Sequence, residues 1–479
     1  MIILATLPFI SDPQPLIFND GVWHFYYLWN KDFPEGNGTE WRHVTSPDLE
    51  VWKDQGVAIP KYATPYGDPW SGDIVIDKEN TAKLGKKTFI ALCTMPGKDN
   101  TGQLVARWVS SDQGKTFHFD RIVIQHPAAE TSSSVFRDPR ILWLDEQRKW
   151  IIAMAETNKI GFYASDDLQQ WNYLSGFSYS NLGVVECPCI FPINAYDENN
   201  KLIGNKWVLL CSANGFKNGF TTSSYYWTGS FDGKQFIADT TEGRWLDAGP
   251  DFYAAAISSS EKLSSKPKNF YYAMAWKNNW DYARQTTQVG YYGSHTRVRV
   301  LTLHRINNNL ILFNTILLKD APLNYRRFAR SLLKQRTLQI RNLFAIPIGS
   351  QSTYLFIAAL SVKNGAWPQQ FEVAFENKDK QIFKVIFHPL QGYITFYRID
   401  NGFVPKPSTV WQAERNANLT FGSRVTLSWF ITEKSVELIF NDGELSLTSL
   451  VLPTTQADNA KIRISDRECL LEGFGILPV

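Results

Sequence analysis

The sequence predicts an all-β protein, in which a five-bladed β-propeller is followed by a β-sandwich. Three observations support this prediction. Aromatic residues make up 14% of the 479 residues, short aromatic-led apolar segments recur 57 to 66 residues apart, and densely spaced alternating segments follow later in the sequence. Aromatic residues favour strands, and evenly repeated units of several short strands are typical of propellers.

The recurring aromatic segments are the first sign of the repeat. Most of them follow a turn signal, such as Asn19-Asp-Gly21, so they are expected to be strands entered from hairpins. Five segments share this pattern: Trp23–Trp29, Phe89–Cys93, Trp150–Met154, Trp207–Cys211 and Phe270–Met274. Their even spacing predicts one blade for each repeat.

A second turn recurs within four of the repeats. In each, Ser and Asp precede an aromatic residue by a few positions. The turns are Ser46–Asp48, Ser111–Asp112, Ser165–Asp167 and Ser230–Asp232, and the aromatic residues are Trp52, Phe117, Trp171 and Phe236. Asp in such a turn satisfies nearby backbone N–H groups. The aromatic residue that follows is expected to pack between neighbouring sheets.

After residue 318 the pattern changes. The basic segment Leu323–Arg336 is expected to be a solvated linker rather than a binding patch. Beyond it lie six alternating segments and one strong hairpin turn: Tyr354–Leu360, Phe371–Phe375, Phe383–Phe387, Tyr393–Tyr397, Val425–Phe430, Val436–Phe440 and Asn441–Gly443. Strands at this density predict a β-sandwich. The predicted domains are therefore a propeller at 1–320, a linker at 321–345 and an accessory sandwich at 346–479.

Composition argues against several classes of protein. Lys and Arg number 49 and Asp and Glu number 46, giving a net charge of +3, which argues against a nucleic-acid-binding protein with a basic surface. A hydrophobic fraction of 44% argues against a disordered chain. No apolar run reaches the ~18 residues of a membrane span, so no membrane contact is expected. The five scattered cysteines match neither a disulfide framework nor a metal pair.

The opening segment Met1–Pro8 is too short for an export leader with a charged start and a cleavage site. Two locations therefore stay open. The protein is expected in the cytoplasm as the sequence is written, or in the periplasm or extracellular space if a leader has been removed. The sequence does not predict an oligomeric state.

An acidic residue precedes the aromatic segment in each repeat. These residues are Asp12, Asp73, Asp138, Glu186 and Asp251. Equivalent blade positions in a propeller form a ring around the central channel, so the five carboxylates are expected to meet at one mouth. Several carboxylates in a concave, aromatic-lined cup suit cleavage of a glycosidic bond. A structural role, in capping strands or binding backbone amides, stays open for individual members.

The motifs around these residues occur in a specific order. They are Ser11-Asp-Pro13 with Asn19–Tyr27, Trp41–His43, Trp70–Asp73, Phe136–Pro139, Glu186-Cys187, Asp251–Ala254, Trp276 with Asn279–Tyr282, and Ser435–Glu444. Over nearly its whole length the chain resembles glycoside hydrolase family 32, the β-fructofuranosidase, levanase and inulinase family.

The resemblance implies a retaining reaction through a fructosyl-enzyme intermediate. Asp12 would be the nucleophile, Glu186 the general acid and base, and Asp138 the residue that stabilises the transition state. The substrate-binding residues expected on this basis are Arg137, Trp29, Trp70, Ser71, Asp73, Cys187, Asp251, Tyr253, Trp276 and Trp280. The substrate would be a fructan or fructo-oligosaccharide, and neither a metal ion nor an organic cofactor is expected.

Four departures from the family pattern concern the fructose pocket. Ser11–Pro15 replaces Asn-Asp-Pro-Asn-Gly, Leu28 stands at the usual Gln, Tyr291–Gly293 replaces Trp-Arg-Gly, and Val298–Val300 replaces Pro-Arg-Glu. The altered pocket favours a levan- or inulin-processing enzyme, either a hydrolase or a fructosyltransferase, over an invertase that splits sucrose.

Two rival functions come from other classes. An inverting propeller acting on arabinan or xylan also uses three carboxylates, which lie farther apart and activate water directly. A carbohydrate-binding propeller with a decayed site would need no catalytic residues. Asp12, Asp138 and Glu186 are all present, which favours the enzyme. His24 and His43 are expected to be hydrogen-bonded structural residues.

Overall fold

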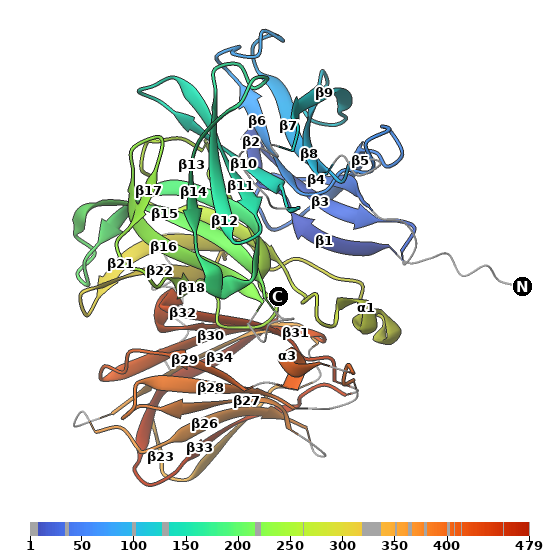
Figure 1. The fold of residues 1–479 in the computed structure, drawn as a ribbon. Helices are drawn as coiled ribbons and strands as arrows, with labels where there is room; N and C mark the ends of the chain where they lie inside the picture. Colours follow the sequence, from blue (N-terminus) through green and yellow to red (C-terminus); the bar gives the residue numbers. More distant parts are fainter. Residues whose placement is uncertain are drawn as a thin grey trace, which may run out of the picture. The chain divides into compact units, whose positions relative to one another are not determined.

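The computed structural model describes residues 8–33, 38–97, 102–126, 134–215, 222–261, 263–318, 337–349, 352–362, 366–377, 381–399, 403–406, 408–412, 414–453 and 455–478. Strands dominate these residues (Figure 1). The helical elements described are short turns: η1 (Ser180–Leu182), α1 (Ala283–Thr286), η3 (Thr287–Val289), α3 (Thr409–Gln412) and η4 (Asn441–Gly443). The prediction of an all-β class is confirmed, and no helix in the described part of the chain could span a membrane.

The chain divides into two compact units. The first comprises the described residues within Met1–Trp245, Tyr253–Trp276 and Tyr292–Ile311. Its first three sheets contain β1 (Phe9–Pro13), β2 (Ile17–Asn19), β3 (Val22–Asn30), β4 (Glu40–Ser46) and β5 (Lys53–Ile59); β6 (Gly72–Asp77), β7 (Thr88–Met95), β8 (Leu104–Ser110) and β9 (His118–Ile124); and β10 (Arg137–Leu144), β11 (Lys149–Glu156), β12 (Lys159–Ser165) and β13 (Asn172–Ser178).

A further sheet of nine strands completes this part of the fold. It contains β14 (Val184–Tyr196), β15 (Leu202–Asn214), β16 (Ser223–Phe231), β17 (Phe236–Ala238), β18 (Arg244–Trp245), β19 (Tyr253–Ser258), β20 (Tyr271–Trp276), β21 (Arg299–Ile306) and β22 (Asn309–Ile316). Two antiparallel groups, β14–β18 and β19–β22, are joined by a short parallel pairing of β14 with β21 and by a parallel bridge between Ile193 and Lys268. The sheet therefore consists of two repeats.

The first strand of each repeat faces the first strands of its neighbours. Contacts join β6 to β10, β10 to β14, β14 to β19 and β19 to β1. A hydrogen bond from the backbone N–H of Gly72 to Gln14 Oε1, at 2.9 Å, links the start of β6 to the segment that follows β1. The second strands carry the aromatic segments predicted from the sequence: four lie within β3, β7, β11 and β15, and the fifth begins one residue before β20.

The recurring Ser and Asp turns form as predicted. In each turn an Asp side chain accepts hydrogen bonds, at 2.7–3.0 Å, from backbone N–H groups two to four residues later: Asp48, Asp112, Asp167 and Asp232. Phe117 is buried in an apolar cluster shared by the first two sheets, and Phe236 in one shared by the third and fourth repeats. These local turns fix where each outer strand begins.

The second unit is a β-sandwich and comprises the described residues within Leu246–Phe252, Lys277–Tyr291 and Leu312–Val479. One sheet contains β23 (Leu338–Ile340), β34 (Cys469–Pro478), β25 (Tyr354–Ser361), β30 (Arg424–Ile431), β31 (Ser435–Phe440) and β32 (Leu445–Leu450); the other contains β24 (Leu343–Pro347), β33 (Asn459–Ile464), β26 (Phe371–Glu376), β27 (Gln381–His388), β28 (Tyr393–Arg398) and β29 (Arg415–Asn418). In Figure 1 these strands are orange to red.

The sandwich core is aromatic. Trp429 on β30 lies 5.8 Å from Phe375 and 6.3 Å from Phe383, ring centre to ring centre, so both sheets contribute to one core. The six alternating segments predicted from the sequence form β25, β26, β27, β28, β30 and β31, which confirms them. The basic segment Leu323–Arg336 lies outside the described residues, and β23 and β24 lie partly within the predicted linker range of 321–345.

A buried ion pair links separate segments of the second unit. The Arg398 guanidinium lies 3.3 Å from Asp251 Oδ2. The same carboxylate accepts a hydrogen bond from the Tyr282 hydroxyl at 2.5 Å and another from the Leu450 N–H at 2.8 Å. Both members of the pair are almost completely shielded from solvent. Each buried charge is therefore compensated by the opposite charge of its partner.

We predict that Asp251→Ala destabilises the protein, because it leaves the Arg398 guanidinium buried and uncompensated. Removing one member of a buried pair costs about 3–5 kcal/mol in the free energy of unfolding. The matched control is Glu472→Ala, which removes a partly exposed partner of Arg424 and should cost less than about 1 kcal/mol. Urea denaturation measures both, and equal losses of stability would contradict the account.

Candidate active site

Four of the inner strands are irregular near their beginning. The regular pairing is interrupted in β1, β10, β14 and β19, between Ile10 and Pro13, Arg137 and Arg140, Glu186 and Cys189, and Tyr253 and Ala256. A bulge redirects the side chains beside it and is frequent next to active sites. The side chains of Asp12, Asp138, Glu186 and Tyr253 all lie in or beside these interruptions.

Three residues at these interruptions adopt the left-handed backbone conformation. Asp138, Cys187 and Ala254 have φ values of 60°, 47° and 53°. Such conformations cost roughly 1–3 kcal/mol and persist where the surroundings hold them. The Asp138 N–H donates to Thr94 Oγ1 at 2.7 Å, and the Cys187 N–H donates to Asp138 Oδ2 at 3.0 Å. The strain is therefore held by contacts among three different strands.

Asp12, on β1, has one carboxylate oxygen engaged and one available. Its Oδ2 accepts a hydrogen bond of 2.6 Å from the Ser71 hydroxyl. Its Oδ1 is buried and accepts no hydrogen bond from the residues that the structure describes. The Asp12 carboxylate is thus oriented through one oxygen while the other is left for a ligand.

Cys187, on β14, joins two of the carboxylates. Its Sγ lies 3.9 Å from Asp12 Oδ2 and 3.7 Å from Asp138 Oδ2. The thiol is buried, and burial together with the nearby Asp138 carboxylate raises its pKa well above the usual value, so it stays protonated. A protonated thiol can donate weakly to either carboxylate and keeps the two apart.

Glu186, also on β14, is held from three sides. Its Oε1 forms an ion pair of 2.6 Å with Arg137. Its Oε2 accepts hydrogen bonds from the Asn214 side chain at 3.2 Å and from the Tyr253 hydroxyl. Arg137 precedes Asp138 and Cys187 follows Glu186 in the sequence, so these contacts tie Asp12, Asp138 and Glu186 into one cluster.

Burial among like charges shifts the protonation of this cluster. Burial, with the Asp138 and Glu186 carboxylates nearby, raises the pKa of Asp12 to about 7. The Ser71 hydrogen bond and the Arg140 guanidinium oppose that rise. Burial also raises the pKa of Asp138, against the opposing effect of Arg137. Raised carboxyl pKa values in a concave cluster are characteristic of catalytic sites.

The structure thus brings together seven of the residues singled out in the sequence. They are Asp12, Ser71, Arg137, Asp138, Glu186, Cys187 and Tyr253. Trp276 packs against Tyr253, one of these residues, and against Phe9 on β1, with ring-centre distances of 6.4 Å and 6.0 Å. Since Trp276 is completely buried, it supports Tyr253 and offers no surface to a sugar in this structure.

Two further tryptophans are only half-buried. Trp29 lies under the Arg42 guanidinium, 4.3 Å from the ring centre. The backbone carbonyl of Trp70 accepts a hydrogen bond of 3.0 Å from the Trp41 indole. Both remain candidates for contact with substrate, Trp70 because it directly precedes Ser71.

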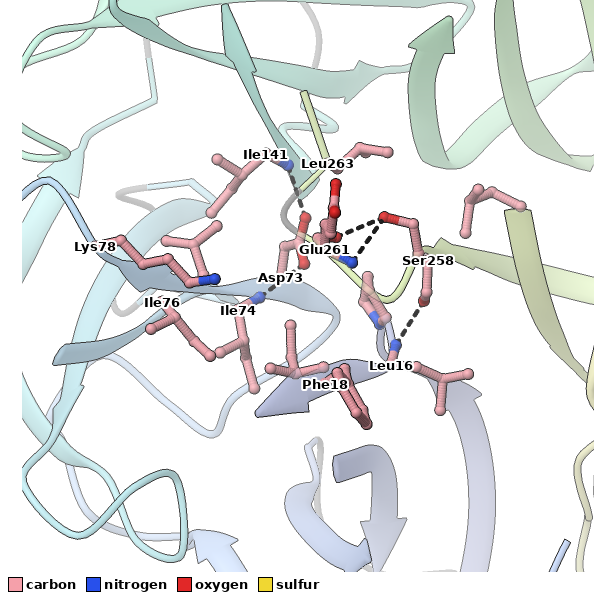
Figure 2. A pocket seen from close by; sticks show the side chains of 15 residues that line it. Leu16, Phe18, Asp73, Ile74, Ile76, Lys78, Ile141, Ser258, Glu261 and Leu263 are labelled. Atoms are coloured by element: carbon pink, nitrogen blue, oxygen red, sulfur yellow. Dashed lines mark hydrogen bonds between the residues drawn. The ribbon is translucent and has the colours of Figure 1, made fainter. Parts of the chain in front are cut away.

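Asp73 has a structural role in the structure, whereas the sequence predicts that it contacts the substrate. Figure 2 shows its carboxylate in the wall of a cavity lined mainly by aliphatic side chains. One oxygen accepts the N–H of Ile74 and the other the N–H of Ile141, both at 2.7 Å. Both oxygens bind backbone amides and join β6 to β10, which is the structural alternative left open from the sequence.

Two other residues expected at the substrate belong to the second unit. Asp251 is completely buried there, and its carboxylate is used by Arg398, Tyr282 and Leu450 as described above. Trp280 is partly exposed, with 37% of its surface accessible. The contacts of Asp251 therefore correspond to the structural role that the sequence analysis left open for individual carboxylates.

Several residues of this region were missed in the sequence analysis. They are Gln14, Thr94, Arg140, Asn214 and His295; the last donates a hydrogen bond of 2.7 Å from its Nε2 to the carbonyl of Ser11. Arg140 had one signal in the sequence, a charged residue directly before the apolar run Ile141–Leu144. The others come from distant segments and carry no local signal. The expected pairing of His24 with a structural partner is confirmed, since its ring nitrogen lies 3.1 Å from that of His43.

The described residues contain no group of three or more His, Cys, Asp or Glu side chains arranged to hold a metal ion. The chemistry that this cluster can perform directly is proton transfer and nucleophilic attack by carboxylates.

Comparisons with known proteins identify the family to which the chain belongs. Residues 5–313 match the model of the glycosyl hydrolases family 32 N-terminal domain, and residues 325–468 match that of the family 32 C-terminal domain. A levanbiose-producing levanase of Bacillus subtilis is 47% identical over 297 residues, which are 61% of this chain and 56% of that relative. The chain thus spans just over half the length of this relative.

Two other matches extend over almost the whole chain. A levanase of Bacillus subtilis is 26% identical over 98% of this chain and 68% of its own length. The solved structure of a fructofuranosidase variant from Schwanniomyces occidentalis, complexed with fructosylnystose, superposes with a TM-score of 0.81 at 23% identity, covering 98% of this chain and 95% of that one. This structural likeness shows the shared fold. Since the family models cover most of the chain, the protein belongs to glycosyl hydrolases family 32.

Proposed function

We propose that this protein is a retaining glycosidase that cleaves β-fructofuranosidic bonds in fructans or fructo-oligosaccharides. The observation that carries the proposal is the arrangement of Asp12 and Glu186 in one half-buried cluster. Asp12 has a buried oxygen without a partner among the described residues, and Glu186 is held by Arg137 and Tyr253. A retaining mechanism needs one carboxylate as nucleophile and one as acid and base.

Asp12 would act as the nucleophile. Its Oδ1 attacks the anomeric carbon of the fructosyl unit, and the bond between that carbon and the bridging oxygen breaks. The Ser71 hydrogen bond to Oδ2 fixes the orientation of the carboxylate for this attack. The product of this step is an ester between Asp12 and fructose.

Glu186 would supply and recover the proton. It protonates the bridging oxygen as the leaving sugar departs, and then takes a proton from water as the water attacks the ester. Net hydrolysis restores both carboxyl groups. The Tyr253 hydroxyl and the Asn214 amide hold Glu186 Oε2 through both steps.

Asp138 and Arg137 would stabilise the sugar in the transition state. Asp138 Oδ2 accepts a hydrogen bond from the Cys187 N–H, and Cys187 Sγ lies 3.7 Å from this oxygen and 3.9 Å from Asp12 Oδ2. A carboxylate placed there stabilises positive charge that develops on the sugar ring. Arg137 holds Glu186 and would contact a hydroxyl of the substrate.

We propose levan or an inulin-type fructan as the substrate. The relative that is 47% identical is named a levanbiose-producing levanase, which makes levan the first substrate to test. The altered residues support a changed fructose pocket: Leu28, at the place of the family's Gln, is buried in an apolar cluster.

We also propose that the first unit is a five-bladed propeller. The support is the cycle of contacts among the first strands of the five repeats, β1, β6, β10, β14 and β19. The division into a catalytic domain at 1–320, a linker at 321–345 and an accessory sandwich at 346–479 stays a prediction. All residues of the proposed mechanism lie within its first part.

Incubation with levan, inulin and sucrose tests the proposed activity. We expect release of fructose or short fructans from levan or inulin, with the β-anomer formed first when products are followed by NMR. Initial formation of the inverted anomer would contradict the retaining mechanism. Transfer of fructosyl groups to another sugar would identify a fructosyltransferase, and binding without any cleavage would identify a carbohydrate-binding protein.

Isosteric substitutions of the two carboxyl groups test their roles. We expect Asp12→Asn and Glu186→Gln each to lower kcat by at least about 10³-fold, because each removes a group that forms or protonates a bond in the reaction. Circular dichroism should show the same fold as the unsubstituted protein. Full activity of either variant would refute the assignment.

The pH dependence of kcat/KM tests the electrostatics of Asp12. Asp12 must be ionised to attack, and its pKa is raised to about 7, so activity should be lost as the pH falls through about 7. Ser71→Ala removes a hydrogen bond that favours the ionised form, and should move the acidic limb to still higher pH. Ser110→Ala, which removes a buried hydroxyl bound to Asp112, is the control and should leave the limb in place. An acidic limb near the ordinary Asp value would contradict the account.

A further inference from the structure

Arg140 is a buried cation that the mechanism above does not use. It lies on β10, two residues after Asp138, and only 2% of its surface is exposed. It forms no ion pair with a carboxylate among the residues that the structure describes. A buried charge without a direct partner costs several kcal/mol, so its place in the fold calls for a reason.

The hydrogen bonds of Arg140 cross from β10 to two other inner strands. One terminal nitrogen donates to the Gly72 carbonyl at the start of β6 and to Gln14 Oε1 at 3.2 Å. The other lies 3.5 Å from the Pro13 carbonyl at the end of β1. The planar guanidinium therefore holds the beginnings of three repeats in a fixed arrangement.

Gln14 extends this network to the backbone of Asp12. Its side chain is completely buried. Its Oε1 accepts from the Gly72 N–H at 2.9 Å, and its Nε2 donates to the Asp12 carbonyl at 3.2 Å. Gln14 is one of the residues in which the opening motif departs from the family pattern. The structure gives that departure a use, because the longer amide reaches Asp12, Gly72 and Arg140 at once.

The charge of Arg140 acts on the buried carboxylates around it. It favours the ionised forms of Asp12 and Asp138, and it is the first of the groups that oppose the effect of burial on Asp73. The groups that face Asp12 are Asp138 and Arg140 from β10, Glu186 and Cys187 from β14, Tyr253 from β19 and the hydroxyl of Ser71. Among them Arg140 is the cation that lowers the pKa of Asp12.

Arg107 shows what a purely structural buried arginine looks like in the same unit. It is equally buried, on β8, and it forms an ion pair of 2.6 Å with Asp120. Its charge is neutralised locally and directed toward the outer strand β9. Arg140 differs in both respects, since it lacks a paired carboxylate and lies beside the proposed nucleophile.

We propose that Arg140, held by Gln14 and the Gly72 carbonyl, is a positioning residue of the active site that fixes the backbone around Asp12 and places a positive charge that favours the ionised Asp12 carboxylate. This inference rests on the proposed function for the role of Asp12. It adds a residue that does not touch the substrate and acts through the nucleophile.

Two substitutions separate the charge of Arg140 from its geometry. Arg140→Met removes the charge, so we expect the acidic limb of kcat/KM to move to higher pH and kcat to fall. Arg140→Lys keeps the charge but loses the planar guanidinium with its several N–H donors. We therefore expect the acidic limb of kcat/KM to stay in place while kcat falls by about 10- to 100-fold, because Asp12 is displaced. KM should be unchanged in both, because Arg140 is shielded from the substrate.

A direct titration keeps the inference separate from the proposed activity. Aspartate labelled with ¹³C at the side-chain carboxyl allows the Asp12 signal to be assigned by its loss in Asp12→Asn and followed by NMR against pH. We expect a higher midpoint in Arg140→Met than in the unsubstituted protein. If the unsubstituted protein cleaves no fructan while the midpoint still rises, the proposed function fails and the inference about Asp12 stands.

Two further variants guard against a general loss of structure. Arg107→Met should lower stability and leave both the Asp12 midpoint and the pH profile unchanged. Gln14→Leu should lower kcat without moving the acidic limb, because it removes only the neutral part of the network.

The inference would be overturned if the Asp12 midpoint were the same in Arg140→Met as in the unsubstituted protein. An equal shift in Arg107→Met would overturn it as well, because the effect would then not be specific to Arg140. If Arg140→Met does not fold, Arg140→Lys provides the test. The inference would be overturned if the acidic limb of kcat/KM in Arg140→Lys moved to higher pH by as much as it does in Ser71→Ala.

Discussion

Asp12, Asp138 and Glu186 are held close together in a largely buried cluster, and two guanidinium groups, Arg137 and Arg140, compensate their charge among the described residues. The rest of the site depends on this electrostatic constraint. Arg137 pairs directly with Glu186, whereas Arg140 acts on Asp12 at longer range. The two cations therefore act on different carboxylates of the cluster, one through a direct ion pair with Glu186 and the other through the network that holds the backbone of Asp12.

The constraint is maintained by strands from different repeats. Asp12, Asp138 and Glu186 come from β1, β10 and β14, and the contacts that orient them run across these strands through Ser71, Thr94 and Cys187. The left-handed conformations of Asp138 and Cys187 would relax if the strands separated. The stability of the repeats and the geometry of the site are therefore coupled. A change that displaces one inner strand also displaces the carboxylates on the others.

Local patterns in the sequence predicted most of the fold and the centre of the site. The aromatic segments and the Asp turns are local features, and the structure forms them where the sequence placed them. The same pattern also selected Asp73 and Asp251, whose carboxylates bind backbone amides or a buried arginine. Position in a repeat indicates which strand end a residue occupies, but bulges and contacts with distant segments decide where its side chain points. Gln14 and Arg140 were missed for the same reason, since their roles appear only once β1, β6 and β10 lie side by side.

The central claim, that Asp12 forms a covalent bond to fructose, can be tested by trapping that bond. The Glu186→Gln variant should accumulate the ester when supplied with a fructosyl fluoride, whose leaving group needs little help from an acid, because water is then activated poorly in the second step. Acid quenching, proteolysis and mass spectrometry identify the modified peptide. The account predicts one added fructosyl group on the peptide that contains Asp12. A fructosyl group on Asp138, or complete turnover without any adduct and with inversion of the anomeric centre, would contradict it.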